Sequence, residues 1–100
     1  MDYITYKKEK LPIRVSYYAL KQYQKETGKD LSDLDENLEN LEILLYHSLI
    51  AGHKSENKEM ILPREEMEFI LDESMGQFNA VIISSFPTPD QLTTDTKKNQ

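Results

Sequence analysis

The stretch that decides the fold is residues 38–52, with the sequence LENLEILLYHSLIAG. Its apolar residues recur at steps of three and four, which is the spacing of one face of an α-helix. This face comprises Leu38, Leu41, Leu45, Ser48 and Leu49, and a wider sector adds Ile43, Leu44 and Ile50. A helix with so wide an apolar sector is predicted to be covered by other elements on more than one side.

Both ends of this helix carry local signals. Asp33 and Glu36 have the spacing of a capping box, and the negative charges of Asp35 and Glu36 suit the positive end of the helix dipole. Gly52 follows the apolar run, at a position where a glycine commonly ends a helix. We therefore expect the helix to run from near Asp33 to about Ala51.

The first fifteen residues alternate as β-strands do. Residues 3–6 (YITY) are rich in β-formers, and residues 11–15 alternate apolar and polar side chains. The charged segment 7–10 (KKEK) separates them, so we predict a two-stranded hairpin with a charged tip. Pro12 lacks an N–H and belongs at a strand start or on an edge. A hairpin this short is marginal alone and must pack on another element.

A second helix is predicted over residues 16–27. As N-cap, Ser16 can accept a hydrogen bond from the following turn, and Gly28 suits the left-handed conformation that ends many helices. The narrow apolar face of this helix consists of Ala19, Leu20 and Tyr23.

The last helical region follows Pro63, a residue favoured in the first turn of a helix. Its apolar stripe keeps helical register over Met67, Ile70, Leu71, Ser74, Phe78, Val81, Ile82 and Ser85. Either one helix is weakened at Gly76 or two helices meet there, and we predict a break near Gly76, because glycine weakens a helix interior. Two prolines then end regular structure. The chain is thus predicted to form one domain over residues 1–86, a mainly α bundle of about three to five helices with the N-terminal hairpin, and a flexible, disordered tail over residues 87–100.

Composition restricts the function classes. The 100 residues include 12 Lys and Arg against 18 Asp and Glu, for a net charge of −6. This acidic balance disfavours nucleic acid and anionic membranes as partners, since both attract clustered cations. There are no cysteines, and no apolar run approaches the ~20 residues that span a bilayer. Because no signal peptide is recognised either, we expect the protein in the cytoplasm.

Candidate catalytic and metal-binding residues do not form a recognised arrangement. His47 and His53 are six residues apart, whereas two metal ligands on one helix face are four apart. The acids of residues 30–42 have no nucleophile, phosphate-binding loop or calcium-loop pattern beside them. A solvated helix face explains these acids, and a docking surface for a basic partner is the alternative. We predict that the protein is not an enzyme and holds no cofactor or metal.

The last helical region has apolar residues outside its main stripe. At about 100° per residue, Phe69 and Ile83 fall nearly opposite the stripe, and Met75 and Phe86 lie to one side. The hairpin or a bent helix can cover them. Alternatively, they form a face for another protein's helix or for self-association into a homo-oligomer.

Several of these features occur together in a known family. A short hairpin precedes a helix with Ala19-Leu20, and residues 26–31 (ETGKDL) follow it. Next come the leucine-rich helix ending at Ala51-Gly52 and a Pro-Arg-Glu-Glu helix start at residues 63–66. Over residues 3–86 the sequence resembles the tail assembly chaperones of long-tailed bacteriophages, which are small, acidic and mostly helical.

The resemblance implies a non-enzymatic role in phage tail assembly, in the host cytoplasm. Such chaperones bind the long, helical tape measure protein before the tail tube polymerises around it, and the tail tube protein is a further expected partner. An apolar groove would receive the helical client, while acidic residues keep the complex dispersed. On this basis we expect the client groove to involve Leu44, Ile50, Phe69, Ile83 and Phe86.

Two other classes of protein share these features. A generic helical adaptor would use the same apolar face for a different client. A small helical transcription regulator would need a recognition helix with cationic and amide side chains on one exposed face. The candidate for that helix, residues 16–29, offers Lys21, Gln22, Lys25 and Lys29. The neighbouring genes separate the classes, because a tape measure gene directly downstream supports the chaperone.

Overall fold

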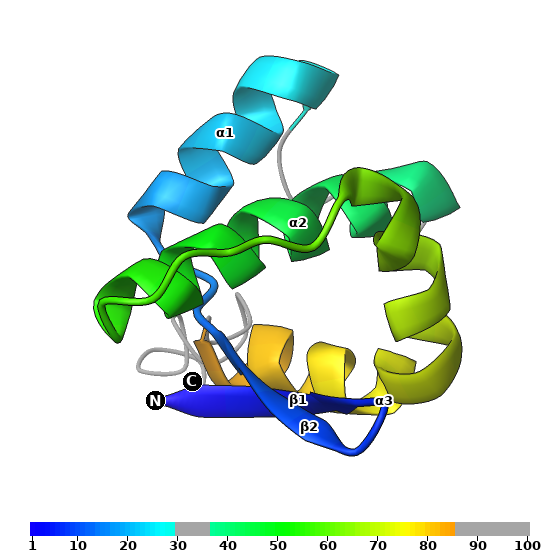
Figure 1. The fold of residues 1–100 in the computed structure, drawn as a ribbon. Coiled ribbons are helices and arrows are strands. Elements are labelled where there is room, and N and C mark those ends of the chain that lie inside the picture. The colour runs from blue at the N-terminus through cyan, green and yellow to red at the C-terminus, as the bar shows by residue number, and fades with distance from the viewer. Residues whose placement is uncertain (30–36, 86–100) are drawn as a thin grey trace, which may run out of the picture.

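One long helix, α2 (Leu38–Ser55), crosses the middle of the computed structural model (Figure 1). The structure describes residues 1–29 and 37–85. The other elements are β1 (Asp2–Tyr6), β2 (Glu9–Ile13), α1 (Tyr17–Thr27) and α3 (Met67–Ser85). Helix α1 covers one side of α2, and the antiparallel hairpin of β1 and β2 covers the other together with α3. The mainly helical fold with an N-terminal hairpin is therefore as predicted.

The core lies between these layers and is built around α2. Leu44, Leu45 and Leu49 of this helix are fully buried, since layers cover α2 on two sides. The wide apolar sector predicted for the helix is thus confirmed. The buried cluster as a whole comprises Ile4, Tyr6, Leu11, Ile13, Val15, Tyr23, Leu41, Leu44, Leu45, Leu49, Met67, Ile70, Leu71, Phe78 and Val81.

Helix α2 begins at Leu38, later than predicted. Asn37 is its N-cap, and the side-chain oxygen Oδ1 of this residue accepts a hydrogen bond from the backbone N–H of Glu39 at 2.8 Å. This bond satisfies one of the free N–H groups of the first turn. The predicted capping pair, Asp33 and Glu36, lies outside the described residues.

The prediction that Gly52 ends this helix is wrong, because α2 continues beyond it. Gly52 is needed for a different reason. A Cβ atom at this position would lie 2.4 Å from the carbonyl oxygen of Pro12 and 2.5 Å from the Cα of Ile13. Close by, the backbone N–H of Arg14 donates to the carbonyl oxygen of Ser48 at 3.0 Å. The chain of β2 therefore crosses α2 with the two backbones in direct contact, which only a glycine permits.

The hairpin turn consists of Lys7 and Lys8, so it is shorter than the predicted four-residue tip. Both lysines have positive φ angles, of 51° and 68°, as a two-residue type I′ turn requires. The register pairs Pro12 with Tyr3. Hydrogen-bonded and non-hydrogen-bonded pairs alternate outward from the turn, which places Pro12 at a non-hydrogen-bonded pair. Its missing N–H therefore removes no bond of the ladder.

Side chains of α3 satisfy the open edge of β1. The backbone N–H of Thr5 donates to Oε1 of Gln77 at 2.6 Å, and the carbonyl oxygen of Thr5 accepts from the hydroxyl of Ser74. The backbone N–H of Lys7 donates to the carboxylate of Glu73, at 3.2 Å from each oxygen. An exposed strand edge invites pairing with other chains, and these bonds cover the end of this edge that lies next to the turn.

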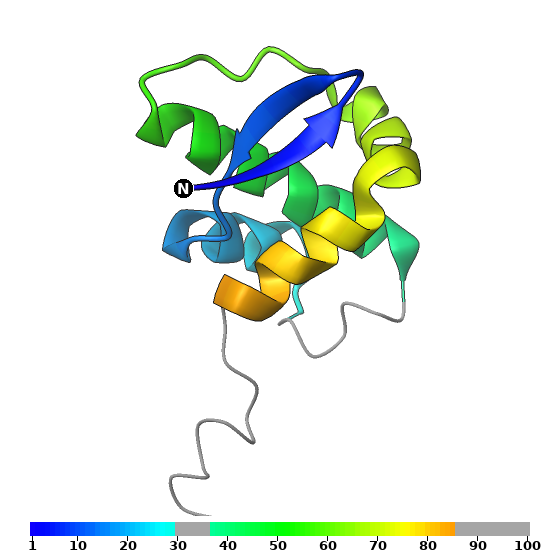
Figure 2. The same cartoon turned by 90° about the horizontal axis from the view of Figure 1, so that it is seen from below.

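Helix α3 bends at Ser74, whose φ of −133° and ψ of 26° leave the helical range (Figure 2). The break predicted near Gly76 therefore lies two residues earlier. The bend falls at Ser74 because the hydroxyl of this residue bonds to β1, a contact that the helical pattern does not reveal. At the start of this region, Pro63 precedes a 3-10 turn (Arg64–Glu66) that leads into α3.

Helix α1 has the predicted ends. The hydroxyl of Ser16 accepts a hydrogen bond from the backbone N–H of Ala19 at 3.4 Å, and Gly28 follows the helix with a left-handed φ of 71°. Ala19 and Tyr23 are fully buried where α1 packs on α2. The cap at each end thus acts as the local sequence indicates.

Replacing Gly52 with alanine should destabilise the protein, because the added methyl group would overlap the backbone of Pro12 and Ile13. We expect the free energy of unfolding, measured by urea denaturation, to fall by about 3 kcal/mol or more. Gly76→Ala is the matched control, since a Cβ there meets nothing within 4 Å. That variant should gain up to about 1 kcal/mol from the better helix propensity of alanine. Similar stabilities for the two variants would contradict the backbone contact between β2 and α2.

Candidate functional site

Three large apolar side chains are exposed on adjoining parts of α2 and α3. Leu38 is 69% exposed, Phe69 51% and Met75 37%. They line two shallow hollows, of about 500 and about 400 Å³, which share Asp72. We call this surface the α3 face. It comprises Leu38, Phe69 and Met75 together with the carboxylates of Glu42, Glu66, Glu68, Asp72 and Glu73.

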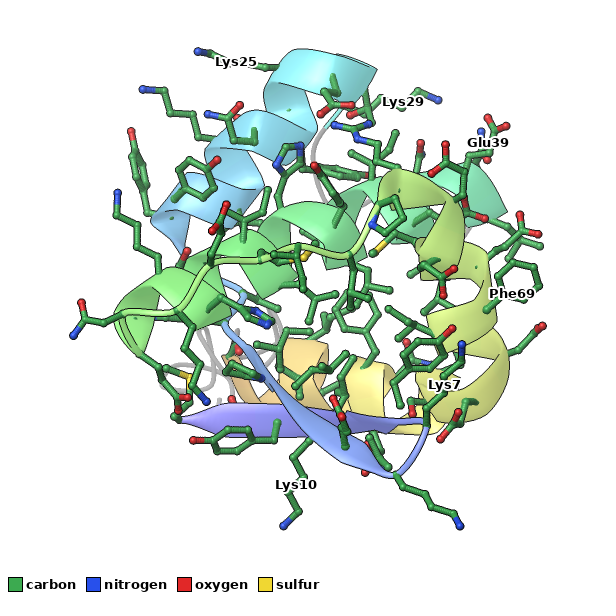
Figure 3. The ribbon with its side chains drawn as sticks, in the orientation of Figure 1. Lys7, Lys10, Lys25, Lys29, Glu39 and Phe69 are labelled. Carbon is green, nitrogen blue, oxygen red and sulfur yellow. The ribbon has the colours of Figure 1, made fainter. Side chains whose placement is uncertain are left out.

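Helical periodicity places Phe69 on this face. The predicted apolar stripe of α3 points inward, and its buried members are Met67, Ile70, Leu71, Ser74, Phe78 and Val81. Phe69 lies on the other side of the helix from this stripe. Figure 3 shows Phe69 pointing away from the core, between Glu39 on α2 and Lys7 at the hairpin turn in that view.

The α3 face is strongly acidic. Glu66 accepts a hydrogen bond from the hydroxyl of Tyr6, and Glu73 accepts one from the backbone N–H of Lys7. Among residues 1–29 and 37–85, none of the five carboxylates of this face forms an ion pair with a lysine or an arginine. No ion pair therefore offsets their negative charges within the described structure.

The titration of Glu42 reflects this excess of negative charge. Burial raises the pKa of Glu42, and the nearby carboxylates of Glu68 and Glu39 raise it further. Like charges on α2 and α3 thus approach each other across the hollow that Glu42 and Glu68 line.

The residues predicted to form a client groove are not brought together. Phe69 lies on the α3 face, but Leu44 is fully buried in the core and offers no surface to a partner. Ile50 is half-buried beside a separate hollow. Ile83 is 65% exposed beyond the bend in α3, and Phe86 lies outside the described residues. The candidate site is therefore the α3 face, and the inclusion of Leu44 is corrected.

Two apolar residues of the α3 face are absent from the predicted groove. Leu38 belongs to the predicted apolar stripe of α2, yet it is exposed at the first position of the helix. The helical pattern places Met75 to one side of the stripe, and this position was a signal that Met75 is exposed. The acids of residues 30–42, for which a docking surface is the alternative interpretation, include Glu42, which lines the face.

A polar cluster joins α1, α2 and the 3-10 turn. Nε2 of His47 lies 2.5 Å from Oε2 of Glu26, and Arg64 binds the two oxygens of Glu26 at 2.8 and 2.5 Å. The guanidinium of Arg64 also lies 4.4 Å from the ring centre of Tyr46. His53 is buried as well and bonds through Nδ1 to a backbone carbonyl of its own helix. Both histidines are thus packed side chains, and His47 connects α2 to α1 through Glu26.

Among the residues that the structure describes, no three His, Cys, Asp or Glu side chains are grouped so that they could hold a metal ion. Within the same residues, no helix has the length and apolar character needed to cross a bilayer. No family model, curated protein or solved structure matches the chain. A functional proposal therefore rests on the chemistry of the α3 face.

The ion pair of Glu26 should make stability depend on pH. Hydrogen bonds from Arg64 and, to a smaller extent, His47 lower the pKa of Glu26 from 4.5 to about 2, although burial opposes this change. A lowered pKa in the folded state adds stability above about pH 4.5 that is lost as the pH falls toward 2. Measured by urea denaturation, the difference in the free energy of unfolding between wild type and Glu26→Gln should be greatest near about pH 7 and shrink in acid.

An Arg64→Gln background provides the control for this prediction. Without the guanidinium, most of the pKa shift of Glu26 should disappear. The effect of Glu26→Gln should then be smaller and depend less on pH, because only the weaker bond to His47 remains. An equally large, pH-dependent effect in both backgrounds would show that Arg64 is not the cause.

Proposed function

We propose that this protein is a non-enzymatic tail assembly chaperone of a long-tailed bacteriophage or prophage, which binds the tape measure protein and keeps it soluble during assembly of the tail tube. The sequence resemblance over residues 3–86 supports this function, and a mainly helical fold with an N-terminal hairpin agrees with it. The observation that carries the proposal is the α3 face, where three large apolar side chains stay exposed beside five carboxylates.

The apolar side chains of the α3 face suit a helical client. Covering apolar surface contributes roughly 25 cal/mol per Å², so Phe69 and Met75 would add affinity when a partner buries them. A helix presents apolar residues at three- and four-residue steps, and such residues can enter the two adjoining hollows. A long helical chain such as the tape measure protein displays many segments of this kind.

In this proposal, the negative charge of the protein keeps the complex with the client soluble. The chain has a net charge of −6, and like-charged complexes repel one another. A client covered by acidic chaperones would therefore stay dispersed in the host cytoplasm until the tube encloses it. The tail tube protein is the second partner in this proposal, and self-association through the α3 face would compete with client binding.

Serine at Phe69 should weaken the binding of tape measure fragments, because an exposed aromatic anchor loses its apolar contact. In titrations with fragments of a candidate tape measure protein from the same genome, we expect Kd to rise about tenfold for Phe69→Ser. The double variant with Met75→Ser should bind more weakly still. Ile61→Ser is the control, since Ile61 is 79% exposed but lines a different hollow.

The same titrations separate the chaperone from its rival. Unchanged binding by a folded Phe69→Ser/Met75→Ser variant would remove the α3 face as the client site. If no tape measure fragment binds the wild-type chain, the protein is better described as a helical adaptor with a different client.

A further inference from the structure

Acidic side chains border the exposed apolar ones around the first half of α3. At about 100° per residue, Glu73 flanks Phe69 on one side and Asp72 flanks it on the other. Met75 and Glu68 follow beyond Asp72, in the hollow that adjoins α2. Each exposed apolar side chain of α3 on this face therefore has a carboxylate at its border.

Cations are scarce on this surface. Among the described residues, Lys7 is the one lysine or arginine that lines either hollow, and its Nζ lies 5.2 Å from the centre of the Tyr6 ring. The two hollows are thus lined by five carboxylates and this single cation. A partner on the α3 face thus meets apolar anchors surrounded by negative charge.

We infer that the α3 face binds a basic amphipathic helix, whose apolar stripe covers Leu38, Phe69 and Met75 while flanking lysines or arginines meet the carboxylates. The inference rests on the proposed function, since it concerns the same surface, and it adds the chemistry of the bound segment. Opposite charges across an interface steer association and exclude partners of the wrong sign. Among the apolar helices of a long client, this surface therefore selects those with basic flanks.

A helix fits this surface better than a strand does. The edge of β1 that faces α3 is occupied at Thr5, whose backbone is bonded to Ser74 and Gln77. These bonds oppose the addition of a peptide strand at that edge. Anionic lipid and nucleic acid are disfavoured for another reason, since their phosphates would face the five carboxylates.

The electrostatic state of the free protein supports the inference. Burial and then the carboxylates of Glu68 and Glu39 raise the pKa of Glu42, so negative charges repel one another across this hollow. A cation of the partner would relieve this repulsion. Removing the charge of Glu68 should relieve it too, so a variant at that position is not expected to unfold the protein.

Two synthetic helical peptides of about 18 residues, or five turns, test the inference with the full 100-residue chain. Both have the same leucine stripe, but one has lysines and the other glutamates on its polar face. We expect the lysine peptide to bind at least about tenfold more tightly at ~0.1 M salt. This advantage should fall at ~1 M salt, where charges are screened beyond about 3 Å. Equal affinities, a preference for the glutamate peptide, or no binding of either would overturn the inference.

Charge reversal locates the binding of the lysine peptide. Glu68→Lys/Asp72→Lys should weaken it by about tenfold or more, because two carboxylates of the face become cations. Asp2→Lys/Glu59→Lys is the matched control, since both residues are exposed and line neither hollow. Equal losses in the two folded variants would show attraction to net charge alone and overturn the assignment to the α3 face.

Binding of tape measure fragments separates this inference from the proposed function. If such fragments bind the α3 face regardless of their charge and of salt, the inference fails and the chaperone proposal stands. If no fragment binds but the lysine peptide binds with the expected selectivity, the chaperone proposal fails and the inference stands.

Discussion

The contact between the backbones of β2 and α2 at Gly52 is the constraint on which the rest of the structure depends. A side chain at Gly52 would overlap Pro12 and Ile13, so the hairpin could not lie across the helix. The hydrogen bond from the N–H of Arg14 to the carbonyl of Ser48 fixes the crossing point. The inward residues of both strands then reach the core. A two-stranded hairpin is marginal in isolation, so this docking makes it part of the fold.

The docked hairpin in turn determines the shape of α3. Thr5 has an N–H and a carbonyl on the free edge of β1, and Gln77 and Ser74 bind them. Helix α3 bends at Ser74, where the second of these bonds forms (Figure 2). Its first half borders the same hollow as the start of α2, and Phe69 and Leu38 stay exposed on the resulting surface. The candidate site therefore follows from the way in which the hairpin edge is satisfied.

Local signals predict most elements of this fold, because caps and periodic stripes act within a few residues. The caps of α1 and the buried stripe of α3 are examples. The roles of Gly52 and Ser74 cannot be predicted from local signals, because their partners, Pro12 and Thr5, are distant in the sequence. A glycine after an apolar run has the same local pattern whether it ends a helix or admits a crossing strand. A serine in an apolar stripe likewise gives no sign that it will bend the helix.

The sequence predicts what kind of site this is, but it does not predict which residues form it. The helical pattern marks Phe69 as lying outside the stripe that builds the core, and the structure leaves it exposed. The same pattern cannot show that Leu44 is enclosed, because that depends on which layers cover α2. Nor can it show that Glu42 and Glu68 line one hollow, since they belong to different helices. An isolated surface carboxylate contributes little to binding, whereas several around an apolar anchor favour a partner of opposite charge. The tertiary arrangement thus gives a charge preference to residues that, taken one by one, are typical of any solvated helix.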